Sequence, residues 1–314
     1  MHINATGYYI PPIRIHNDYF LEVNGLSSDW IFQRTGIETR TKVAEGENSF
    51  TMGRKAVTRA AEKLPYPIEE VDLIISAGYT PQDTVGTLAH TVQRDFNIPN
   101  AVSVMISSAC SSCVNAIEIV EGYFAANKAS KALIVCSENN SYYNDESDPN
   151  SGHLWGDAAI AMFISKEKVT ENDPEILNVI SHGLGHIGKG PEGVCLAPKE
   201  GKLEMPNGKD VFANATRYMI DAVNEVTAKS NVELAELDYI IAHQANMRII
   251  SNVLKNLDFP ESKSLNNIRN YGNTGSASAF LVMMEHEKTF QKGNLVGITV
   301  FGGGYSSGAT LIRF

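Results

Sequence analysis

The expected order of helices and strands occurs twice along the chain, and this duplication limits the possible folds more than any other feature of the sequence. In each half, an amphipathic helix, a continuous apolar strand, a loop, a second helix and two further strands follow one another. The paired segments are 50–64 with 211–228, 71–77 with 237–243, 132–137 with 295–301, and 156–164 with 307–314. They are separated by roughly 165 residues, far more than the ~20–50 residues of a solenoid repeat.

Two similar α/β halves with buried strands predict a layered α/β/α/β/α sandwich with a pseudo-twofold axis and two central helices. We place the halves at residues 1–165 and 166–314. Residues 165–210 are rich in glycine, lysine and proline, and we expect them to elaborate the core. The polar residues 139–154 predict a surface loop.

Residues 101–128 place a cysteine between a strand and the first central helix. Val102 to Ile106 is an apolar run, and after three small residues apolar side chains recur at helical spacing. Cys110 is therefore expected in the turn before the helix, where exposed backbone N–H groups and the helix dipole favour its thiolate. The sequence nominates Cys110 as a nucleophile, and this stretch alone leaves a buried apolar cysteine open as the alternative.

The other cysteines do not suggest a disulfide framework, because only four cysteines occur in 314 residues. Cys113 completes a C-x-x-C pattern with Cys110, but it shares the apolar stripe of the helix and is expected in the core. A redox dithiol stays open as a minor alternative. A zinc site needs about two further ligands, which Cys136 in an apolar run and the isolated Cys195 do not provide, so no metal site is predicted.

Composition and charge narrow the classes of function. Apolar residues make up 43% of the sequence and charged residues 20%, as in globular proteins. No apolar run approaches the ~20 residues of a membrane span, and the N-terminus lacks the pattern of a signal peptide, so a cytoplasmic protein is expected. The formal net charge of −10 argues against nucleic acid as a general partner.

Three segments of the second half carry candidate chemistry. His243 ends one buried strand, Gly302-Gly303-Gly304 follows another, and Asn273 lies before the second central helix, where Cys110 lies in the first half. Active groups gather at the carboxyl ends of strands in α/β folds. Each residue also has an ordinary explanation: a core histidine, a turn or capping asparagine, and glycines that only permit a turn.

Several short motifs belong together. They are Ser28-Asp29-Trp30-Ile31, Arg34-Thr35-Gly36-Ile37, Ser108-Ala109-Cys110, Gly156-Asp157-Ala158, Gly208 with Val211-Phe212, His243-Gln244-Ala245-Asn246 with Arg248, Gly272-Asn273-Thr274, and Phe301-Gly302-Gly303-Gly304-Tyr305 through Arg313-Phe314. Over nearly the whole chain, they resemble the β-ketoacyl-acyl-carrier-protein synthase III family of the thiolase superfamily. The resemblance implies a thiolase-like fold and an acyltransferase of fatty acid or related lipid and polyketide synthesis.

The chemistry that the resemblance implies is a decarboxylative Claisen condensation, with the family's Cys-His-Asn set on Cys110, His243 and Asn273. Cys110 would take an acyl group from acyl-coenzyme A or an acyl carrier, and the backbone N–H groups of Cys110 and Gly303 would bind the oxyanion. His243 and Asn273 would stabilise the enolate formed as malonyl-acyl-carrier protein loses CO₂. The family uses no metal or redox cofactor, and coenzyme A enters as a thioester substrate.

The resemblance also assigns binding roles. Trp30 would stack on the adenine of coenzyme A and Arg34 would contact its phosphates, whereas the residues alone favour a core tryptophan and a solvated arginine. Arg248 would dock the acidic carrier protein. The remaining coenzyme A candidates are Gly208, Ala245 and Asn246.

Three positions depart from the family pattern. Ala213 stands where a basic residue usually follows the Val-Phe pair, and residues 145–155 lack an arginine that often contacts coenzyme A. Val85-Gly86 replaces a Phe-Pro pair that, in the family's homodimer, reaches across to close the acyl pocket of the partner. We expect this chain to form a homodimer as well. The smaller Val85 predicts a primer longer or bulkier than acetyl. These departures favour a specialised relative that makes alkylresorcinol-, quinolone- or polyene-type products.

Two other classes of function stay open. A non-condensing acyltransferase or thioesterase would use Cys110 without needing Asn273, and release of CO₂ from a malonyl thioester separates it from a condensing enzyme. A non-catalytic binding or redox protein would use Cys110 and Cys113, and acylation of Cys110 by acyl-coenzyme A would exclude it.

Overall fold

The computed structural model describes residues 1–197 and 202–314, and within these residues nine strands form one mixed sheet. The strand order is β11-β12-β13-β8-β1-β7-β6-β4-β5. The strands are β1 (His2–Tyr9), β4 (Leu73–Ala77), β5 (Val102–Ile106), β6 (Lys131–Glu138), β7 (Ala158–Ser165), β8 (Glu175–Gly183), β11 (Tyr239–Ala242), β12 (Leu295–Gly302) and β13 (Ser306–Arg313). Two short ribbons accompany them: β2 (Ile13–His16) with β3 (Thr39–Lys42), and β9 (Cys195–Leu196) with β10 (Leu203–Glu204).

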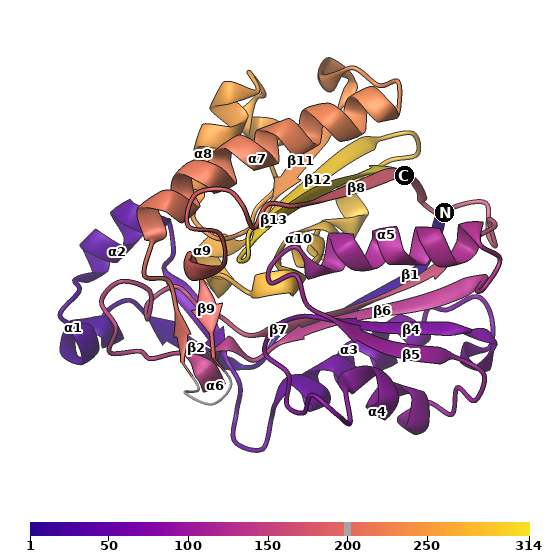
Figure 1. Ribbon diagram of the computed structural model, residues 1–314, viewed down its shortest axis with the longest axis horizontal. Helices are drawn as coiled ribbons and strands as arrows, with labels where there is room; N and C mark the ends of the chain where they lie inside the picture. Colours follow the sequence, from indigo (N-terminus) through magenta and orange to yellow (C-terminus); the bar gives the residue numbers. More distant parts are fainter. Residues whose placement is uncertain (198–201) are drawn as a thin grey trace.

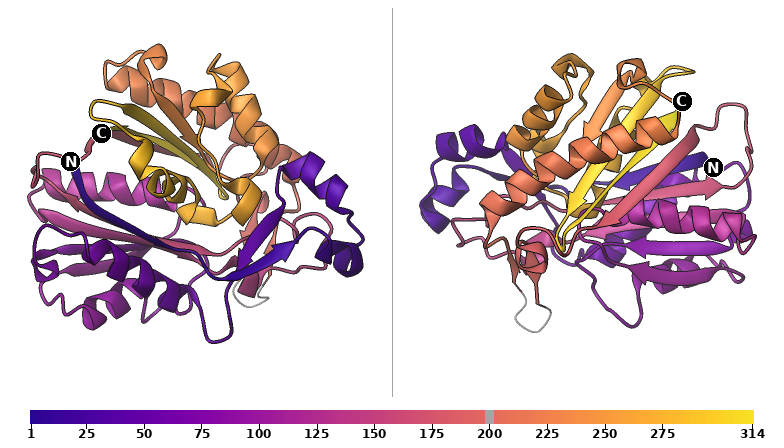
Figure 2. Two further views of the ribbon diagram at one scale, coloured as in Figure 1. Left: turned by 180° about the vertical axis from the view of Figure 1, so that it is seen from behind. Right: turned by 45° about the horizontal axis from the view of Figure 1, so that its top comes forward.

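The helices lie in three layers around two groups of strands (Figures 1 and 2). They are α1 (Tyr19–Asn24), α2 (Ser28–Thr35), α3 (Ser49–Ala61), α4 (Leu88–Asp95), α5 (Ser112–Ala125), α6 (Asn140–Tyr143), α7 (Gly208–Lys229), α8 (Met247–Asn256), α9 (Ile268–Tyr271) and α10 (Ser278–Glu285). Helices α5 and α10 lie between the groups, α3 and α4 cover one outer face, and α7 and α8 cover the other (Figure 1). The predicted α/β/α/β/α sandwich is confirmed.

The two strand groups share one pairing pattern, which supports the predicted duplication. β4 and β6 pair in parallel, and β7 and β1 continue antiparallel. In the same way, β11 and β12 pair in parallel, and β13 and β8 continue antiparallel. β5 is parallel to β4, and at the equivalent edge a parallel bridge joins Ile240 to Ser264. The division at residues 165 and 166 itself stays a prediction.

Two predictions about irregular segments are wrong. Residues 175–183 are not an elaboration but form β8, in which only three of nine residues are buried, so it lacks the continuous apolar run that marks β4 or β6. The prediction of a surface loop over residues 139–154 is wrong at its two ends, because Asn140 and Ser151 are fully buried, whereas residues 141–150 are half-exposed or exposed. Their polar groups find distant partners, such as the carbonyl of Gly156, which accepts from Asn140 Nδ2 at 2.7 Å. Residues 198–201 of the segment 165–210 lie outside the described residues.

The core around the central helices contains the expected cysteine. Cys113 on α5 and Cys136 on β6 are both fully buried in the same apolar cluster, so the prediction that Cys113 is a core residue is confirmed. No helix formed by residues 1–197 and 202–314 combines the length and the apolar character that crossing a membrane requires.

Candidate active site

Cys110 lies in the turn between β5 and α5, as the sequence predicts. Ala109 adopts φ +49°, a left-handed conformation that costs a non-glycine residue roughly 1–2 kcal/mol. This sharp turn places Cys110 two residues before α5, whose N-cap is Ser111. The Cys110 side chain is buried, and its Sγ lies 4.0 Å from the hydroxyl of Tyr79. Strained turns of this kind are typical of functional sites.

The electrostatic environment of this thiol differs from the sequence prediction. Burial, together with the carboxylate of Glu138, raises the pKa of Cys110 to about 12. The sequence predicts that N–H groups at the helix start favour the thiolate, and in the structure burial outweighs the backbone N–H that acts in this direction. The Tyr79 hydroxyl and the backbone N–H of Cys110 act in the opposite direction and lower this pKa. Any reaction of Cys110 as a thiolate needs such donors, because desolvation penalises the charged form.

The glycines at the end of β12 pack directly against the Cys110 turn. A Cβ atom on Gly302 would lie 2.6 Å from Ser108 O and 2.9 Å from Cys110 N, closer than atoms approach in proteins. Gly303 follows, with its Cβ position 3.6 Å from the side chain of Ala109. The absence of a side chain at Gly302 lets the two backbone segments touch. The predicted oxyanion donors, Cys110 N and Gly303 N, therefore belong to adjacent segments.

Asn273 is fixed from the opposite side of the site by the strand-like segment before β7. Its backbone N–H donates to Leu154 O at 2.8 Å, and its carbonyl accepts from Gly156 N at 2.9 Å. Gly156 is required there, because a Cβ atom would lie 1.9 Å from Tyr271 O. The side-chain oxygen of Asn273 accepts from Gly275 N at 3.0 Å, which leaves the amide nitrogen as the donor that can face a substrate.

His243 follows β11 and is oriented by the second central helix. Its Nδ1 lies 2.7 Å from the hydroxyl of Ser278, the first residue of α10. That hydroxyl already accepts from Gln244 N at 3.4 Å, so we assign its proton to His243 Nδ1. Burial lowers the pKa of His243 to about 4, so the imidazole is neutral at pH 7 and carries its proton on Nε2. His243 is thus a neutral hydrogen-bond donor.

Glu138, which the sequence reasoning missed, joins the Cys110 side of the site to the Asn273 side. This fully buried carboxylate ends β6 and accepts from Thr80 N at 3.1 Å and from the hydroxyl of Ser276 at 2.5 Å. Tyr79 N donates to it at 3.3 Å. Burial raises the pKa of Glu138 to about 7. Asn273 and Ser276 precede α10, so these contacts link the Cys110 side of the site to the segment that carries Asn273.

The predicted coenzyme A residues of α2 lie on its exposed face. Ile31 and Thr35 form the buried face of this helix, whereas Trp30 is 37% exposed. The alternative of a core tryptophan is therefore wrong. The Arg34 guanidinium lies 5.0 Å from the centre of the Trp30 ring, one helical turn away. Trp30 and Arg34 form one cation–π pair that is open to solvent.

The other predicted binding residues border the same rim. Met247, at the start of α8, packs against Gly36, which directly follows α2. Asn246 caps α8 by accepting from Arg248 N at 2.8 Å, and the exposed Arg248 guanidinium lies 5.9 Å from the Phe212 ring of α7. The remaining candidates are the half-buried Ala245 and the exposed Gly208, which is the first residue of α7.

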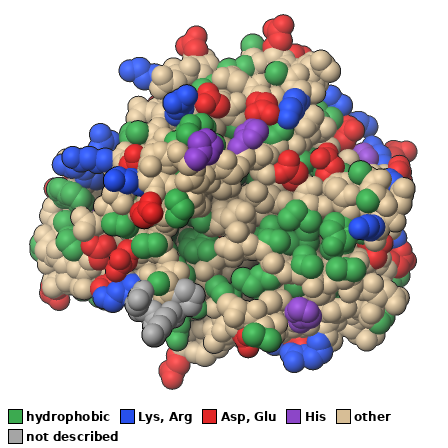
Figure 3. All heavy atoms as spheres, viewed as in Figure 1, with side chains coloured by type: hydrophobic (Ala, Val, Ile, Leu, Met, Phe, Trp, Pro, Cys, Tyr) green, Lys and Arg blue, Asp and Glu red, His purple; other side chains and the backbone are tan. Residues whose placement is uncertain are grey.

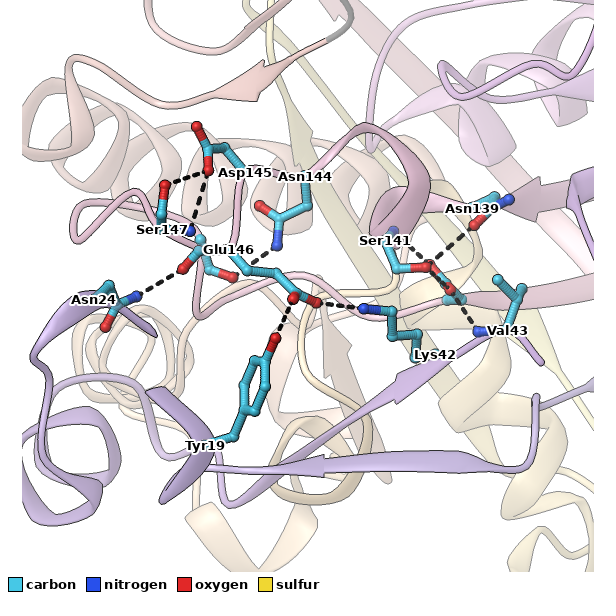
Figure 4. A network of polar contacts seen from close by, with 12 residues as sticks. Tyr19, Asn24, Lys42, Val43, Asn139, Ser141, Asn144, Asp145, Glu146 and Ser147 are labelled. Carbon is cyan, nitrogen blue, oxygen red and sulfur yellow. Dashed lines mark hydrogen bonds and ion pairs between the residues drawn. The ribbon is translucent and has the colours of Figure 1, made fainter. Parts of the chain in front are cut away.

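The segment that lacks the family's arginine makes a different set of contacts (Figure 4). Glu146 accepts from the Tyr19 hydroxyl at 2.6 Å and pairs with Lys42 at 2.7 Å, while its carbonyl accepts from Asn24 Nδ2 at 3.0 Å. These contacts fasten residues 145–155 to the N-terminal segment that carries α1 and α2. Carboxylates thus lie in the segment where the family pattern has a cation.

Val85 is the remaining predicted site residue, and it is placed here together with the cavity and the metal-binding groups of the structure. Val85 is 85% exposed, in a turn where Asp83 accepts from its backbone N–H at 2.7 Å. A cavity of about 640 Å³ lies away from Cys110, between β1, residues 170–175 and the C-terminus, and none of the predicted site residues lines it. Within residues 1–197 and 202–314, no group of three His, Cys, Asp or Glu side chains is placed to hold a metal ion.

Comparisons with known proteins identify the family and agree with the fold. Models described as 3-Oxoacyl-[acyl-carrier-protein (ACP)] synthase III and its C terminal match residues 105–184 and 227–314. A β-ketoacyl-[acyl-carrier-protein] synthase III of Clostridium tetani is 34% identical, over 99% of this chain and 98% of its own. The crystal structure of 3-oxoacyl-[acyl-carrier-protein] synthase III from Aquifex aeolicus has a TM-score of 0.92 at 31% identity, covering 100% of this chain and 99% of that chain. The corresponding structure from Thermus thermophilus has a TM-score of 0.92 at 28% identity, with the same coverage.

Proposed function

Because the chain belongs to the 3-oxoacyl-[acyl-carrier-protein] synthase III family, we propose that it condenses an acyl primer with malonyl-acyl-carrier protein through an acyl-cysteine on Cys110. The enzyme is an acyltransferase with the family's role in fatty acid biosynthesis. One observation carries the finer mechanism: hydrogen bonds and close contacts link the nucleophile turn, through Tyr79 and Glu138, to the segment that begins with Asn273.

In the first stage, the Cys110 thiolate attacks the thioester carbon of the primer. The carbonyl oxygen becomes an oxyanion, which the backbone N–H groups of Cys110 and Gly303 bind; losing one such donor costs about 3–4 kcal/mol in other enzymes. The intermediate collapses with breakage of the bond to the sulfur of coenzyme A. That sulfur takes up a proton equivalent to the one Cys110 lost, and the acyl group stays on Sγ.

In the second stage, malonyl-acyl-carrier protein binds with its thioester carbonyl facing His243 Nε2–H and the amide of Asn273. The malonyl carboxylate leaves as CO₂, and the electron pair of the broken bond becomes an enolate whose oxygen these two neutral donors stabilise. A neutral imidazole fits this role because its proton is fixed on Nε2 by the contact of Nδ1 with Ser278. The carbanion attacks the acyl carbon and releases Cys110. No step uses a metal or redox cofactor.

Substrate delivery is proposed at the rim formed by α2 and the first turns of α7 and α8. Trp30 and Arg34 would receive the adenine and phosphates of coenzyme A, with Gly208, Ala245 and Asn246 along the pantetheine. Arg248 would contact the acidic carrier protein. This arrangement is supported by the exposure of the Trp30–Arg34 pair and by the packing of α8 against the end of α2.

The enzyme is proposed to act as a homodimer that pairs through β5. In the sheet of the described residues, β5 is paired on one side only, and Val102 is 45% exposed. Apolar side chains gather over α5 and β5 on the face seen in Figure 3. An exposed apolar edge strand is a template for pairing with another chain. Dimerisation would bring Val85 of one protomer to the acyl pocket of its partner.

A specialised pathway is the second candidate, and the small exposed Val85 favours it. If Val85 leaves the acyl pocket wide, primers longer or bulkier than acetyl react faster. A series of acyl-coenzyme A primers of increasing length, at saturating malonyl-acyl-carrier protein, measures this directly. A clear preference for acetyl would contradict a widened pocket, without touching the condensing mechanism.

Release of CO₂ tests the condensing reaction itself. Malonyl-acyl-carrier protein labelled in the free carboxyl should lose its label in the presence of acyl primer, and a 3-oxoacyl product should accumulate in equal amount. An acyltransferase that does not condense would acylate Cys110 and release no label. That outcome would replace the proposed function by simple acyl transfer.

A further inference from the structure

Tyr79 occupies the space between the starts of the two central helices. It lies two residues after the buried end of β4, and its hydroxyl lies 4.0 Å from Cys110 Sγ. On the other side, the same hydroxyl lies 2.6 Å from the position of a Cβ atom on Gly275, which precedes α10. Gly275 adopts φ +61° and has no side chain, which leaves room for the phenol. The Tyr79 hydroxyl is thus inside the site formed by Cys110 and Asn273.

The position of Tyr79 is fixed by neighbours that do not compete for its proton. Its backbone N–H donates to the carboxylate of Glu138 at 3.3 Å, and Thr80 is bound to the same carboxylate. The side chains that face the phenol are Cys110, Glu138 and Asn140, and the amide of Asn140 lowers the pKa of the phenol. Burial and the negative groups nearby raise the pKa of Tyr79 well above its ordinary value, so the phenol keeps its proton.

The thiolate of Cys110 needs a donor of this kind. Burial and Glu138 both disfavour its charge, and the Tyr79 hydroxyl is the side chain that favours it. In the thiol form, the Cys110 S–H points to the tyrosine oxygen. After ionisation, this hydrogen bond reverses, because the sulfur has no proton and the phenol does. A hydrogen bond to an ionised group is roughly twice as strong as one between neutral groups.

We propose that Tyr79 is a further catalytic residue, whose hydroxyl donates a hydrogen bond to Cys110 Sγ whenever that sulfur is a thiolate. The inference rests on the proposed function. The thiolate exists twice in the cycle: before attack on the primer, and again when the acyl carbon–Sγ bond breaks and its electron pair returns to sulfur. In both stages the phenol keeps its proton and shares it with Sγ, so no additional acid or base is consumed.

The test is the pH dependence of Cys110 alkylation by iodoacetamide, measured by peptide-resolved mass spectrometry, which separates Cys110 from the exposed Cys195. Tyr79→Phe keeps the ring and removes the donor. We expect alkylation at pH 8 to slow about tenfold, the factor that a rise of one unit in the pKa of Cys110 produces. Tyr143→Phe is the matched control, because the Tyr143 hydroxyl donates at 2.7 Å to Pro81 O in the same loop. Its profile should match the wild type within twofold.

Two outcomes overturn the proposal. A Tyr79→Phe profile that coincides with the wild type would show that the hydroxyl does not hold the thiolate. Equal slowing in Tyr79→Phe and Tyr143→Phe would assign the effect to the loop rather than to the donor. Because alkylation needs no acyl substrate, either outcome leaves acylation of the wild type intact. Failure of the proposed function would instead appear as a wild type that is not acylated, or that is acylated but releases no labelled CO₂, and it would leave the comparison of the two variants unchanged.

Discussion

Gly302→Ala probes whether the close contact between the β12 glycines and the Cys110 turn matters for catalysis. The added Cβ would lie 2.6 Å from Ser108 O and 2.9 Å from the backbone nitrogens of Cys110 and Ser111. Ordinary contact begins near 3.4 Å, so the two segments must move apart by about 0.8 Å. All three atoms nearest the new methyl group belong to the backbone, so no flexible side chain can absorb the shift.

The expected result is a large loss of acyl transfer with a moderate loss of stability. A displacement of about 1 Å in a catalytic group lowers the rate roughly 10²-fold, and overpacking a core costs about 1–3 kcal/mol. We expect the rate of acyl-enzyme formation, followed by quenched intact-mass measurement, to fall roughly 10²-fold. The unfolding free energy, measured in urea, should fall by about 1–3 kcal/mol while the protein stays folded.

The matched control is Gly183→Ala at the end of β8. Gly183 has no atom within 4 Å of its Cβ position, and it pairs with Ser306 in the same group of strands. This variant should acylate at the wild-type rate. If Gly302→Ala also acylates within twofold of the wild type, the contact does not position the Cys110 N–H, and the proposed oxyanion site is refuted.

Three further predictions address the other residues. His243→Ala should still form the acyl-enzyme but lose CO₂ release from labelled malonyl-acyl-carrier protein by roughly 10²–10³-fold; a normal yield of product would show that the donor is assigned wrongly. Glu138 has a folded-state pKa of about 7, above the ordinary 4.5, so the wild-type protein should lose stability as the pH rises between these values. Between pH 4.5 and pH 8, the free energy of unfolding measured in urea should fall by about 3 kcal/mol more in the wild type than in Glu138→Gln. An equal fall in both proteins would contradict the raised pKa. Trp30→Ala should raise the KM for acyl-coenzyme A about tenfold at unchanged kcat, as expected for a lost binding contact, and an unchanged KM would remove Trp30 from the coenzyme A site.

Strands buried on both faces were the easiest elements to predict from the sequence. β4, β6 and β7 are continuous apolar runs, and the structure buries almost every residue of each. β8 was missed because only three of its nine residues are buried and polar side chains interrupt its pattern. Burial of Asn140 was also invisible locally, since its partner Gly156 lies 16 residues away. Hydrophobic patterns report burial only where the buried groups are apolar.

The sequence predicted the site residues before the two central helices, but not the residues that lie between them. Cys110 and Asn273 occupy equivalent positions before the two central helices, which the duplication indicated. Tyr79 and Glu138 were missed because they are 59 residues apart and meet only through the parallel pairing of β4 and β6. A signal existed: Glu138 ends a buried strand and Tyr79 lies two residues after another, where functional groups of α/β folds gather. Applying that rule to the first half as well as the second would have found them.

The environment of Trp30 shows the limit of reasoning from residue type. Tryptophan is usually highly buried, and the sequence alone favoured a core position. In α2, however, Ile31 and Thr35 already form the face turned to the protein, which leaves Trp30 and Arg34 together on the outside. The family resemblance led to the exposed pair, because it added information about function that a helical pattern does not contain.

The most direct test of the whole account is intact-mass measurement after incubation with a panel of acyl-coenzyme A and acyl-carrier primers, followed by malonyl-acyl-carrier protein. We expect a mass increase of one acyl group, located on Cys110 and absent in Cys110→Ala, which disappears as CO₂ and a 3-oxoacyl product form. Acylation that survives Cys110→Ala, or condensation by a wild-type protein that never carries the acyl group, would contradict the acyl-cysteine mechanism.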